Sequence, residues 1–160
     1  MEQNQTLAKW IWKDGCTGTN ITCNFRRVFC LDQAVGEASL QISAHHHVKV
    51  YINGHRLSGI CSPAASGFPN TKWYLTYDIA PYLVQGENVI AATVLFIGGD
   101  GQNHVTGCPA LWFTARCRMQ DGTERLIPSD EHCRASSHTG YRPHLPLREL
   151  RRLTGSTYFD

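Results

Sequence analysis

The segment Gly98–Gly107 carries the side chains in this sequence that best suit a ligand. Asp100, Gln102, Asn103 and His104 bring hydrogen-bond acceptors and donors together within five positions. Side chains of these types on loops between rigid strands commonly hold sugar hydroxyls, and the neighbouring glycines let the backbone approach a ligand closely. We therefore expect a carbohydrate site here. The Asp and Asn oxygens would also suit calcium, and a long solvated loop without a ligand is the simpler alternative.

The run His45-His46-His47 raises the question of a metal site. On a strand, His45 and His47 would point to the same side, because side chains alternate with period two. Zinc requires three or four ligands that converge, and the sequence indicates no third or fourth partner. We therefore expect a polar turn at this position and no metal site.

No residue of the chain is a convincing catalytic group. Asp78 stands three positions before Pro81, where it can accept hydrogen bonds from the free N–H groups of a following turn. Ser43 and Ser58 have histidines nearby but lie outside any Gly-x-Ser-x-Gly motif, so a serine hydrolase is not supported.

The four tryptophans are a further candidate binding feature, because indole rings stack on sugar rings. Trp10, Trp12, Trp73 and Trp112 all fall in predicted strands, which favours packing in the core or against another domain. Trp10 and Trp12 would share one face of a short strand near the terminus. We expect that face to be the one that packs on a neighbouring domain.

Length and charge limit the class of protein. The chain has 160 residues, enough for one domain with a hydrophobic core, and a formal net charge of +2. No folded basic face with interleaved aromatic residues is evident, so a nucleic-acid partner is not expected. The first residues are polar and no segment resembles a signal peptide or a membrane span, so we expect no membrane association.

The seven cysteines are odd in number, irregular in spacing and without a C-x-x-C motif. Cys23 and Cys30 fall on or near apolar strand positions, where a free thiol acts as a small hydrophobic side chain. Reduced, buried thiols in a cytoplasmic protein are the preferred interpretation.

Alternation of apolar and polar residues predicts strands and no long helix. The clearest case is 37–44, with Leu40 and Ile42 facing inward, and Asn53-Gly54 predicts a tight hairpin turn. Strands without intervening helices favour an antiparallel β-sandwich. We expect all-β structure in residues 1–133 and a basic linker, or the start of a following domain, in 134–160. The other predicted strands are 8–12, 23–31, 48–52, 55–60, 73–78, 89–96, 110–119 and 123–128.

Several blocks together resemble one family. The most characteristic is the unit from Trp73 to Ala92, which contains Tyr77-Asp78-Ile79 and Gly86-Glu87-Asn88-Val89. Taken in order, the blocks resemble the N-terminal β-sandwich of bacterial α-L-rhamnosidases of glycoside hydrolase family 78, over roughly residues 8–135. The remaining blocks are Trp10-Ile11-Trp12, Phe25–Phe29, Leu40–Ala44, Val50–Gly54, Asp121-Gly122 and Ser129-Asp130-Glu131.

The resemblance implies a jelly-roll sandwich of the galactose-binding type and an accessory role. In that family the catalytic carboxylates lie in a later (α/α) barrel, which this chain is too short to contain. The expected function is thus a non-catalytic domain that packs on or supports such a barrel. Rhamnose-containing glycans are the ligands that the resemblance implies. The alternatives are a free-standing carbohydrate-binding module and a protein-interaction sandwich with no sugar role.

Overall fold

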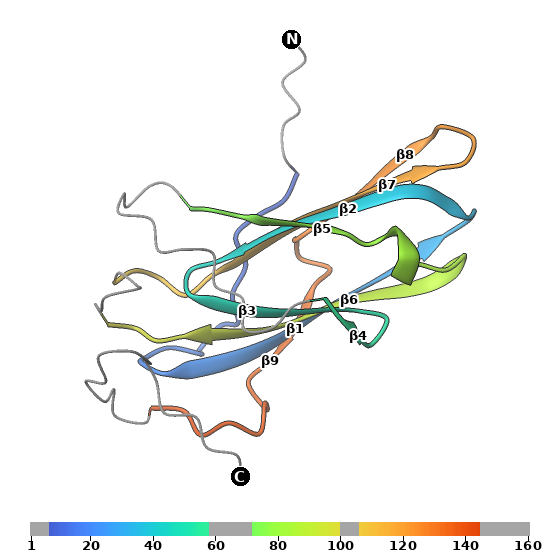
Figure 1. Ribbon diagram of the computed structural model, residues 1–160. Helices are drawn as coiled ribbons and strands as arrows, with labels where there is room; N and C mark the ends of the chain where they lie inside the picture. The colour runs from blue at the N-terminus through green and yellow to red at the C-terminus, as the bar shows by residue number, and fades with distance from the viewer. Residues whose placement is uncertain (1–6, 58–71, 100–105, 145–160) are drawn as a thin grey trace.

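The computed structural model describes residues 7–57, 72–99 and 106–144, which fold into two antiparallel sheets stacked face to face (Figure 1). The five-stranded sheet has the order β4-β3-β6-β1-β9, and the four-stranded sheet has the order β5-β2-β7-β8. The all-β sandwich predicted from the sequence is therefore confirmed. The elements are β1 (Ile21–Leu31), β2 (Val35–Ala44), β3 (His47–Ile52), β4 (His55–Arg56), β5 (Leu75–Asp78), a 3-10 helix η1 (Ala80–Tyr82), β6 (Gly86–Phe96), β7 (Leu111–Met119), β8 (Glu124–Pro128) and β9 (Arg134–Ser136).

The core lies between the two sheets and follows the alternation in the sequence. In β2, Leu40 and Ile42 are fully buried, whereas Gln41 between them is half-buried on the outer face. Ile42 stands opposite Phe113 of β7 and Leu75 of β5, so its side chain contributes to the centre of the inner layer. In the described part of the chain, no helix is long and apolar enough to cross a membrane.

The last strand lies beyond the boundary that the sequence suggested. Arg134–Ser136 forms β9 and pairs with Asn24–Arg26 of β1, so the sheet continues past Cys133, where we expected the linker to begin. The physical reason is that the backbone groups along this edge of β1 need partners, and β9 supplies them. A three-residue strand with little hydrophobic alternation gives no sequence signal of its own.

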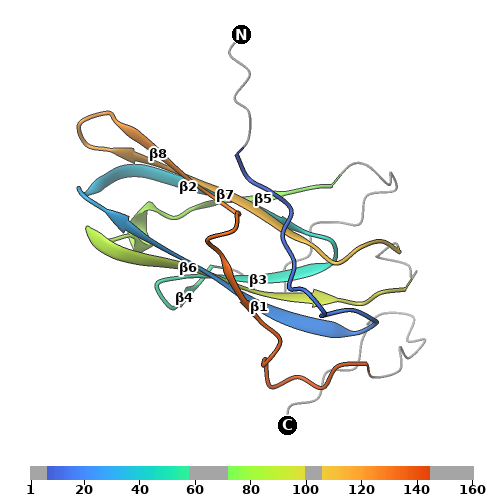
Figure 2. The same cartoon turned by 180° about the vertical axis from the view of Figure 1, so that it is seen from behind.

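The N-terminal segment differs from the expected strand. Its pairing with the sheet is the single bridge between Ile11 and Leu111, and the segment passes from the four-stranded sheet to the five-stranded one (Figure 2). Because it crosses between layers, Trp10 and Trp12 have different surroundings and do not share a face. Trp12 packs on Phe25 with ring centroids 5.5 Å apart, and its indole N–H donates to the Cys16 carbonyl at 2.7 Å.

The unit between β5 and β6 forms as its sequence predicts. The Asp78 carboxylate accepts the Ala80 N–H at 3.0 Å, Pro81 lies in the first turn of η1, and Gly86 has a φ of +98°. The left-handed conformation at Gly86 favours a residue without a Cβ. This unit carries the chain from the four-stranded sheet to the five-stranded sheet.

Asn88 is the fully buried polar residue that holds this crossing in place. Its amide oxygen accepts the Val84 N–H at 2.9 Å, and its amide nitrogen donates to the carbonyls of Val84 and Gly86 at 2.7 and 3.0 Å. The same oxygen accepts the amide of Asn53, at 2.8 Å, from the turn between β3 and β4. Asn53 has a φ of +49° and also bonds the Tyr82 carbonyl and the Val89 N–H. One pair of amides thus joins a hairpin turn to the crossing.

Replacing Asn88 by Ala should lower the free energy of unfolding by about 1–3 kcal/mol, because backbone groups that it satisfies lose their partners. The measurement is urea denaturation at pH 7. The control is Glu87→Ala, one residue away on the exposed side, which should cost less than about 0.5 kcal/mol. Equal losses for the two variants would contradict a structural role for the amide pair.

The described cysteines range from fully buried through half-buried to exposed. Cys23 and Cys117 are fully buried, and burial raises the pKa of the Cys23 thiol to about 12 and that of Cys117 to about 11. The neighbouring Cys16 adds to the increase at Cys23. Cys30 is exposed, so the expectation of a buried thiol there is wrong. It shares the outer face of β1 with Arg26 and Val28, because residues two apart point to the same side.

The raised pKa of Cys117 predicts a loss of stability in alkali. Below pH 9, the ordinary thiol pKa given for this group, both folded and unfolded chains hold the proton, and the stabilisation is complete. Between pH 9 and about 11 the unfolded chain ionises first, so the free energy of unfolding should fall by at most about 1.4 kcal/mol per pH unit from this group. In reducing buffer, urea denaturation of Cys117→Ala should show a shallower alkaline loss than the parent. Cys30→Ala is the exposed control and should keep the parental slope; equal slopes in all three proteins would contradict the prediction.

Candidate functional site

The loop predicted to bind sugar falls largely outside the described residues. Asp100, Gln102, Asn103 and His104 all lie in the undescribed range 100–105, so their role in binding a glycan or calcium stays a prediction. The flanks of the loop are placed at the same end of the sandwich as the connection between β2 and β3 (Figure 1). Gly107 lies directly against the ring of His45, with no room for a side chain.

The triple histidine is more deeply packed than the polar turn that the sequence suggested. His46 is 3% exposed, its Nδ1 accepts the Ile97 N–H at 2.8 Å, and its ring stacks on Phe96 with centroids 4.9 Å apart. The His45 ring meets the His46 ring edge-on at 4.6 Å. Within residues 7–57, 72–99 and 106–144, no three His, Cys, Asp or Glu side chains cluster as metal ligands would. The described geometry assigns His46 a structural task, which is to fasten the β2–β3 connection to the end of β6.

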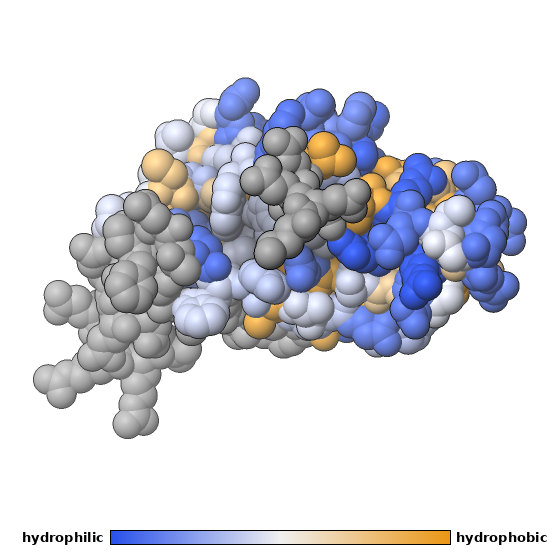
Figure 3. All heavy atoms as spheres, turned by 90° about the horizontal axis from the view of Figure 1, so that it is seen from above, coloured by the Kyte–Doolittle hydropathy of each residue, from blue (hydrophilic) through white to orange (hydrophobic). Residues whose placement is uncertain are grey.

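The outer face of the four-stranded sheet carries a row of aromatic side chains, which we call the aromatic row: Trp10, Trp112 and Tyr74. Ring centroids are 6.4 Å apart for Trp10 and Trp112 and 6.3 Å apart for Trp112 and Tyr74. Trp10 is 48% exposed and Tyr74 54%, and Trp73 beside the row is 61% exposed. Figure 3 looks onto this face, where the most hydrophilic side chains gather at the opposite end, over the turn between β7 and β8.

Strand register explains why the row forms. Ser43 of β2 stands opposite Trp112 of β7, and the pairing of Ile42 with Leu75 places Tyr74 on its other side. Ser43 is small, so the two large rings close over it and leave it 2% exposed. Its hydroxyl donates to the Trp73 carbonyl at 2.7 Å, which fixes the chain just before β5.

Trp10 is held at the end of the row by hydrogen bonds on both sides of it. The Lys9 N–H donates to the Ser129 carbonyl at 2.7 Å, and the Ser129 hydroxyl donates to the Lys9 carbonyl at 2.7 Å. Ile11 exchanges two backbone hydrogen bonds with Leu111, at 2.8 and 2.9 Å. Ser129 is fully buried and also accepts the Phe113 N–H, at 3.1 Å. The aromatic row is therefore part of a fixed surface.

The two acidic residues after Ser129 strengthen this attachment. Asp130 makes an ion pair of 3.4 Å with Arg27 of β1, in which both side chains are less than a fifth exposed. Glu131 pairs with Lys9 at 3.0 Å on the surface. The block Ser129-Asp130-Glu131 thus connects the N-terminal segment, β7 and the five-stranded sheet.

This architecture agrees with the comparison to known families. Residues 33–142 match the family model described as the alpha-L-rhamnosidase N-terminal domain. The chain belongs to this family. The resemblance noted in the sequence is confirmed. Two of the blocks that carried it, Trp73–Ala92 and Ser129-Asp130-Glu131, join the two layers of this rhamnosidase N-terminal domain.

Similar proteins show how the domain occurs elsewhere. An α-L-rhamnosidase of Formosa agariphila is 27% identical over an alignment of 126 residues, which covers 71% of this chain and 13% of that protein. The structure of an α-L-rhamnosidase from Dictyoglomus thermophilum superposes with a TM-score of 0.76 at 21% identity, over 90% of this chain and 18% of that one. A family 78 rhamnosidase of Bacillus sp. GL1 gives a TM-score of 0.73 at 29% identity, over 85% and 14%. The chain thus spans less than a fifth of each of these three relatives, and their homologous domains belong to larger rhamnosidase chains.

Four carboxylates in the described part of this rhamnosidase N-terminal domain have structural surroundings. A general acid requires a raised pKa, but the pKa of Asp121 is lowered, chiefly by hydrogen bonds from Thr123. The pKa of Glu131 is lowered by a backbone hydrogen bond and by Lys9. Asp130 faces Arg27 and Asp78 binds η1. None of these four groups has the environment of a proton donor to a glycosidic oxygen.

Proposed function

We propose that this chain is a non-catalytic accessory domain of an α-L-rhamnosidase-like glycoside hydrolase, and that it packs on a catalytic part absent from this chain. The observation that carries the proposal is family membership combined with the aromatic row on the outer face of the four-stranded sheet. Exposed aromatic patches of this kind are commonly buried at interfaces. Since the chain corresponds to 13–18% of its relatives' length, a further domain is the partner we expect.

Three properties of the aromatic row suit a docking surface. Trp112 lies on β7, and Trp10 and Tyr74 lie on segments fixed by hydrogen bonds, so little conformational entropy is lost when a partner covers the rings. Tryptophan and tyrosine contribute strongly to binding energy at the centre of interfaces. The ion pairs of Arg116 with Glu124 and of Arg118 with Glu37 lie toward the other end of the same sheet and would suit a polar rim.

A free-standing carbohydrate-binding module is the second candidate, and the same row favours it, because aromatic rings also stack on sugars. The two functions differ in what covers the rings. A partner domain would bury all three rings together, whereas a sugar ring would engage one or two of them.

The isolated chain should not hydrolyse an aryl α-L-rhamnoside, because inverting or retaining hydrolysis requires two suitably placed carboxyl groups. Release of the aryl group is followed by absorbance at high protein concentration. Turnover that disappears when a carboxylate of this chain is replaced by its amide would contradict an accessory role. Turnover that survives every such replacement would indicate a contaminating enzyme. The protein is then purified again and the assay is repeated.

Docking can be measured with the polypeptide encoded after Asp160, produced separately and mixed with this chain. Replacing Trp10 and Trp112 together by Ala should weaken association at least about tenfold, as loss of central interface aromatics does. Val28→Ala, at an exposed apolar residue on the outer face of the five-stranded sheet, is the control and should leave affinity unchanged. The docking proposal would be contradicted if no downstream domain exists, or if the double variant binds the downstream polypeptide with the parental affinity. In the latter case, titration of rhamnose against tryptophan fluorescence tests the second candidate.

A further inference from the structure

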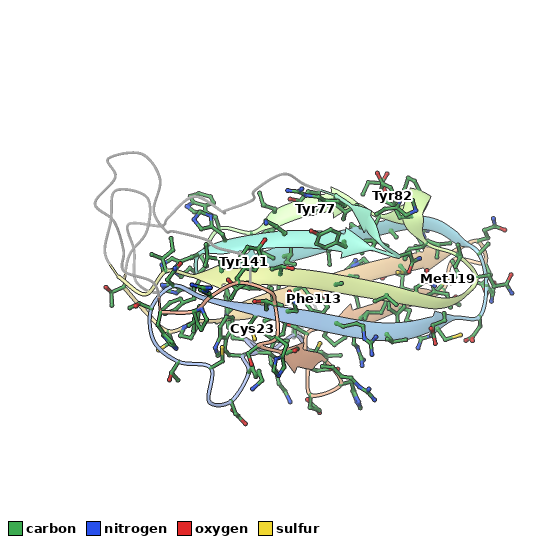
Figure 4. The ribbon with its side chains drawn as sticks, turned by 90° about the horizontal axis from the view of Figure 1, so that it is seen from below. Cys23, Tyr77, Tyr82, Phe113, Met119 and Tyr141 are labelled. Atoms are coloured by element: carbon green, nitrogen blue, oxygen red, sulfur yellow. The ribbon has the colours of Figure 1, made fainter. Side chains whose placement is uncertain are left out.

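The opposite side of the sandwich, the outer face of the five-stranded sheet, contains a groove of about 450 Å³. Figure 4 looks onto this face, with Tyr141 on it. The floor of the groove comes from β1 and β6, one wall from β3 and the other from β9. The groove is separate from the aromatic row, so a ligand bound in it would not depend on the docking of a partner domain.

Strand register creates the groove. Ala91 of β6 stands directly between Arg26 of β1 and Tyr51 of β3. The Ala91 methyl group extends much less far from the sheet than the side chains of Arg26 and Tyr51, so a depression forms between these two. β9 raises the other wall, because Arg134 stands opposite Arg26 and Ser136 opposite Asn24.

The groove has an unbalanced positive charge. Arg26 and Arg134 are directly opposed, which places their Cβ atoms about 4.5–5.5 Å apart, and like charges in such pairs destabilise a sheet. Neither has a carboxylate within 4 Å among the described residues, whereas Arg27, Arg116 and Arg118 each have one. No carboxylate is among the described residues that line the groove. Two guanidinium groups arranged in this way suit a bound carboxylate, which would relieve their repulsion.

The rest of the lining suits a sugar ring. Ala91 and the face of Tyr51 offer apolar surface for ring C–H groups. The Thr93 hydroxyl donates to the Asn24 amide oxygen at 2.9 Å, which leaves the Asn24 amide nitrogen as a donor for a hydroxyl group. β6 is paired on both sides, with β3 and β1, and along the groove β1 is paired with both β6 and β9. An acidic peptide therefore finds no free strand edge on the floor to extend.

We propose that this groove binds the uronic acid residue of an acidic glycan. The carboxylate is held by Arg26 and Arg134, and the sugar ring lies over Ala91 beside Tyr51. The ligand class is thus an anionic hexuronate, which is distinct from a neutral deoxysugar such as rhamnose.

The test is a titration of the isotopically labelled protein with sodium glucuronate and sodium galacturonate, followed by NMR shifts of backbone amides. At least one of these uronates should shift Ala91, Thr93 and Ala135 with a millimolar dissociation constant, and glucose and galactose at the same concentration should not. Arg26→Gln and Arg134→Gln should each weaken binding at least about fivefold. Arg118→Gln, at an exposed arginine of the other sheet, is the matched control and should change nothing. Unchanged thermal melting of the variants establishes that they remain folded.

Other outcomes would overturn the proposal. Equal shifts with glucose would mean that charge does not select the ligand, and equal shifts with acetate would reduce the groove to a simple anion site. Binding of a hexaglutamate peptide in place of either uronate would assign the groove to an acidic protein segment. Uronate shifts that survive both arginine variants, or no shifts with either uronate, would show that the groove is not the site.

Discussion

The hydrogen-bonded pair of amides at Asn53 and Asn88 is the interaction on which much of this sandwich depends. A sandwich must carry its chain from one sheet to the other, and such a crossing leaves backbone groups without ladder partners. Here the crossing between β5 and β6 satisfies them with the side chain of a fully buried asparagine. The same amide receives Asn53 from the β3–β4 turn, so one buried polar group determines where two loops lie. A half-satisfied network at this position would cost more than an apolar core.

Another connection between the sheets uses the same principle with different residues. The N-terminal segment and the chain after β8 run along one side of the sandwich, and Ser129 joins them through its hydroxyl and backbone. The partly buried pair of Arg27 and Asp130 then connects this joint to the five-stranded sheet. These contacts keep Trp10 against Trp112, so the exposed aromatic row is a consequence of how the layers are joined.

Each outer face owes its main feature to one small residue between large ones. Ser43 allows Trp112 and Tyr74 to meet above it, whereas Ala91 leaves a depression between Arg26 and Tyr51. The two faces consequently differ: one presents stacked aromatic rings, and the other presents an open groove beneath paired arginines. A domain with one face suited to a protein partner and the other to an acidic glycan could be covered on one side and still bind on the other.

The sequence alone was enough to predict the long strands of the core, the tight turns and the family, but not the N-terminal segment or β9. Alternation fixes which face of β2 is buried, and the φ requirement of Asn53-Gly54 fixes a hairpin, because both depend on neighbours along the chain. The tertiary structure decided what depends on residues far apart. It added β9 to the sheet beyond Cys133, exposed Cys30, buried His46 against Phe96 and separated Trp10 from Trp12. It also brought Arg26 opposite Arg134, 108 positions later. No local pattern encodes that juxtaposition, because it arises only when two distant strands pair in one register.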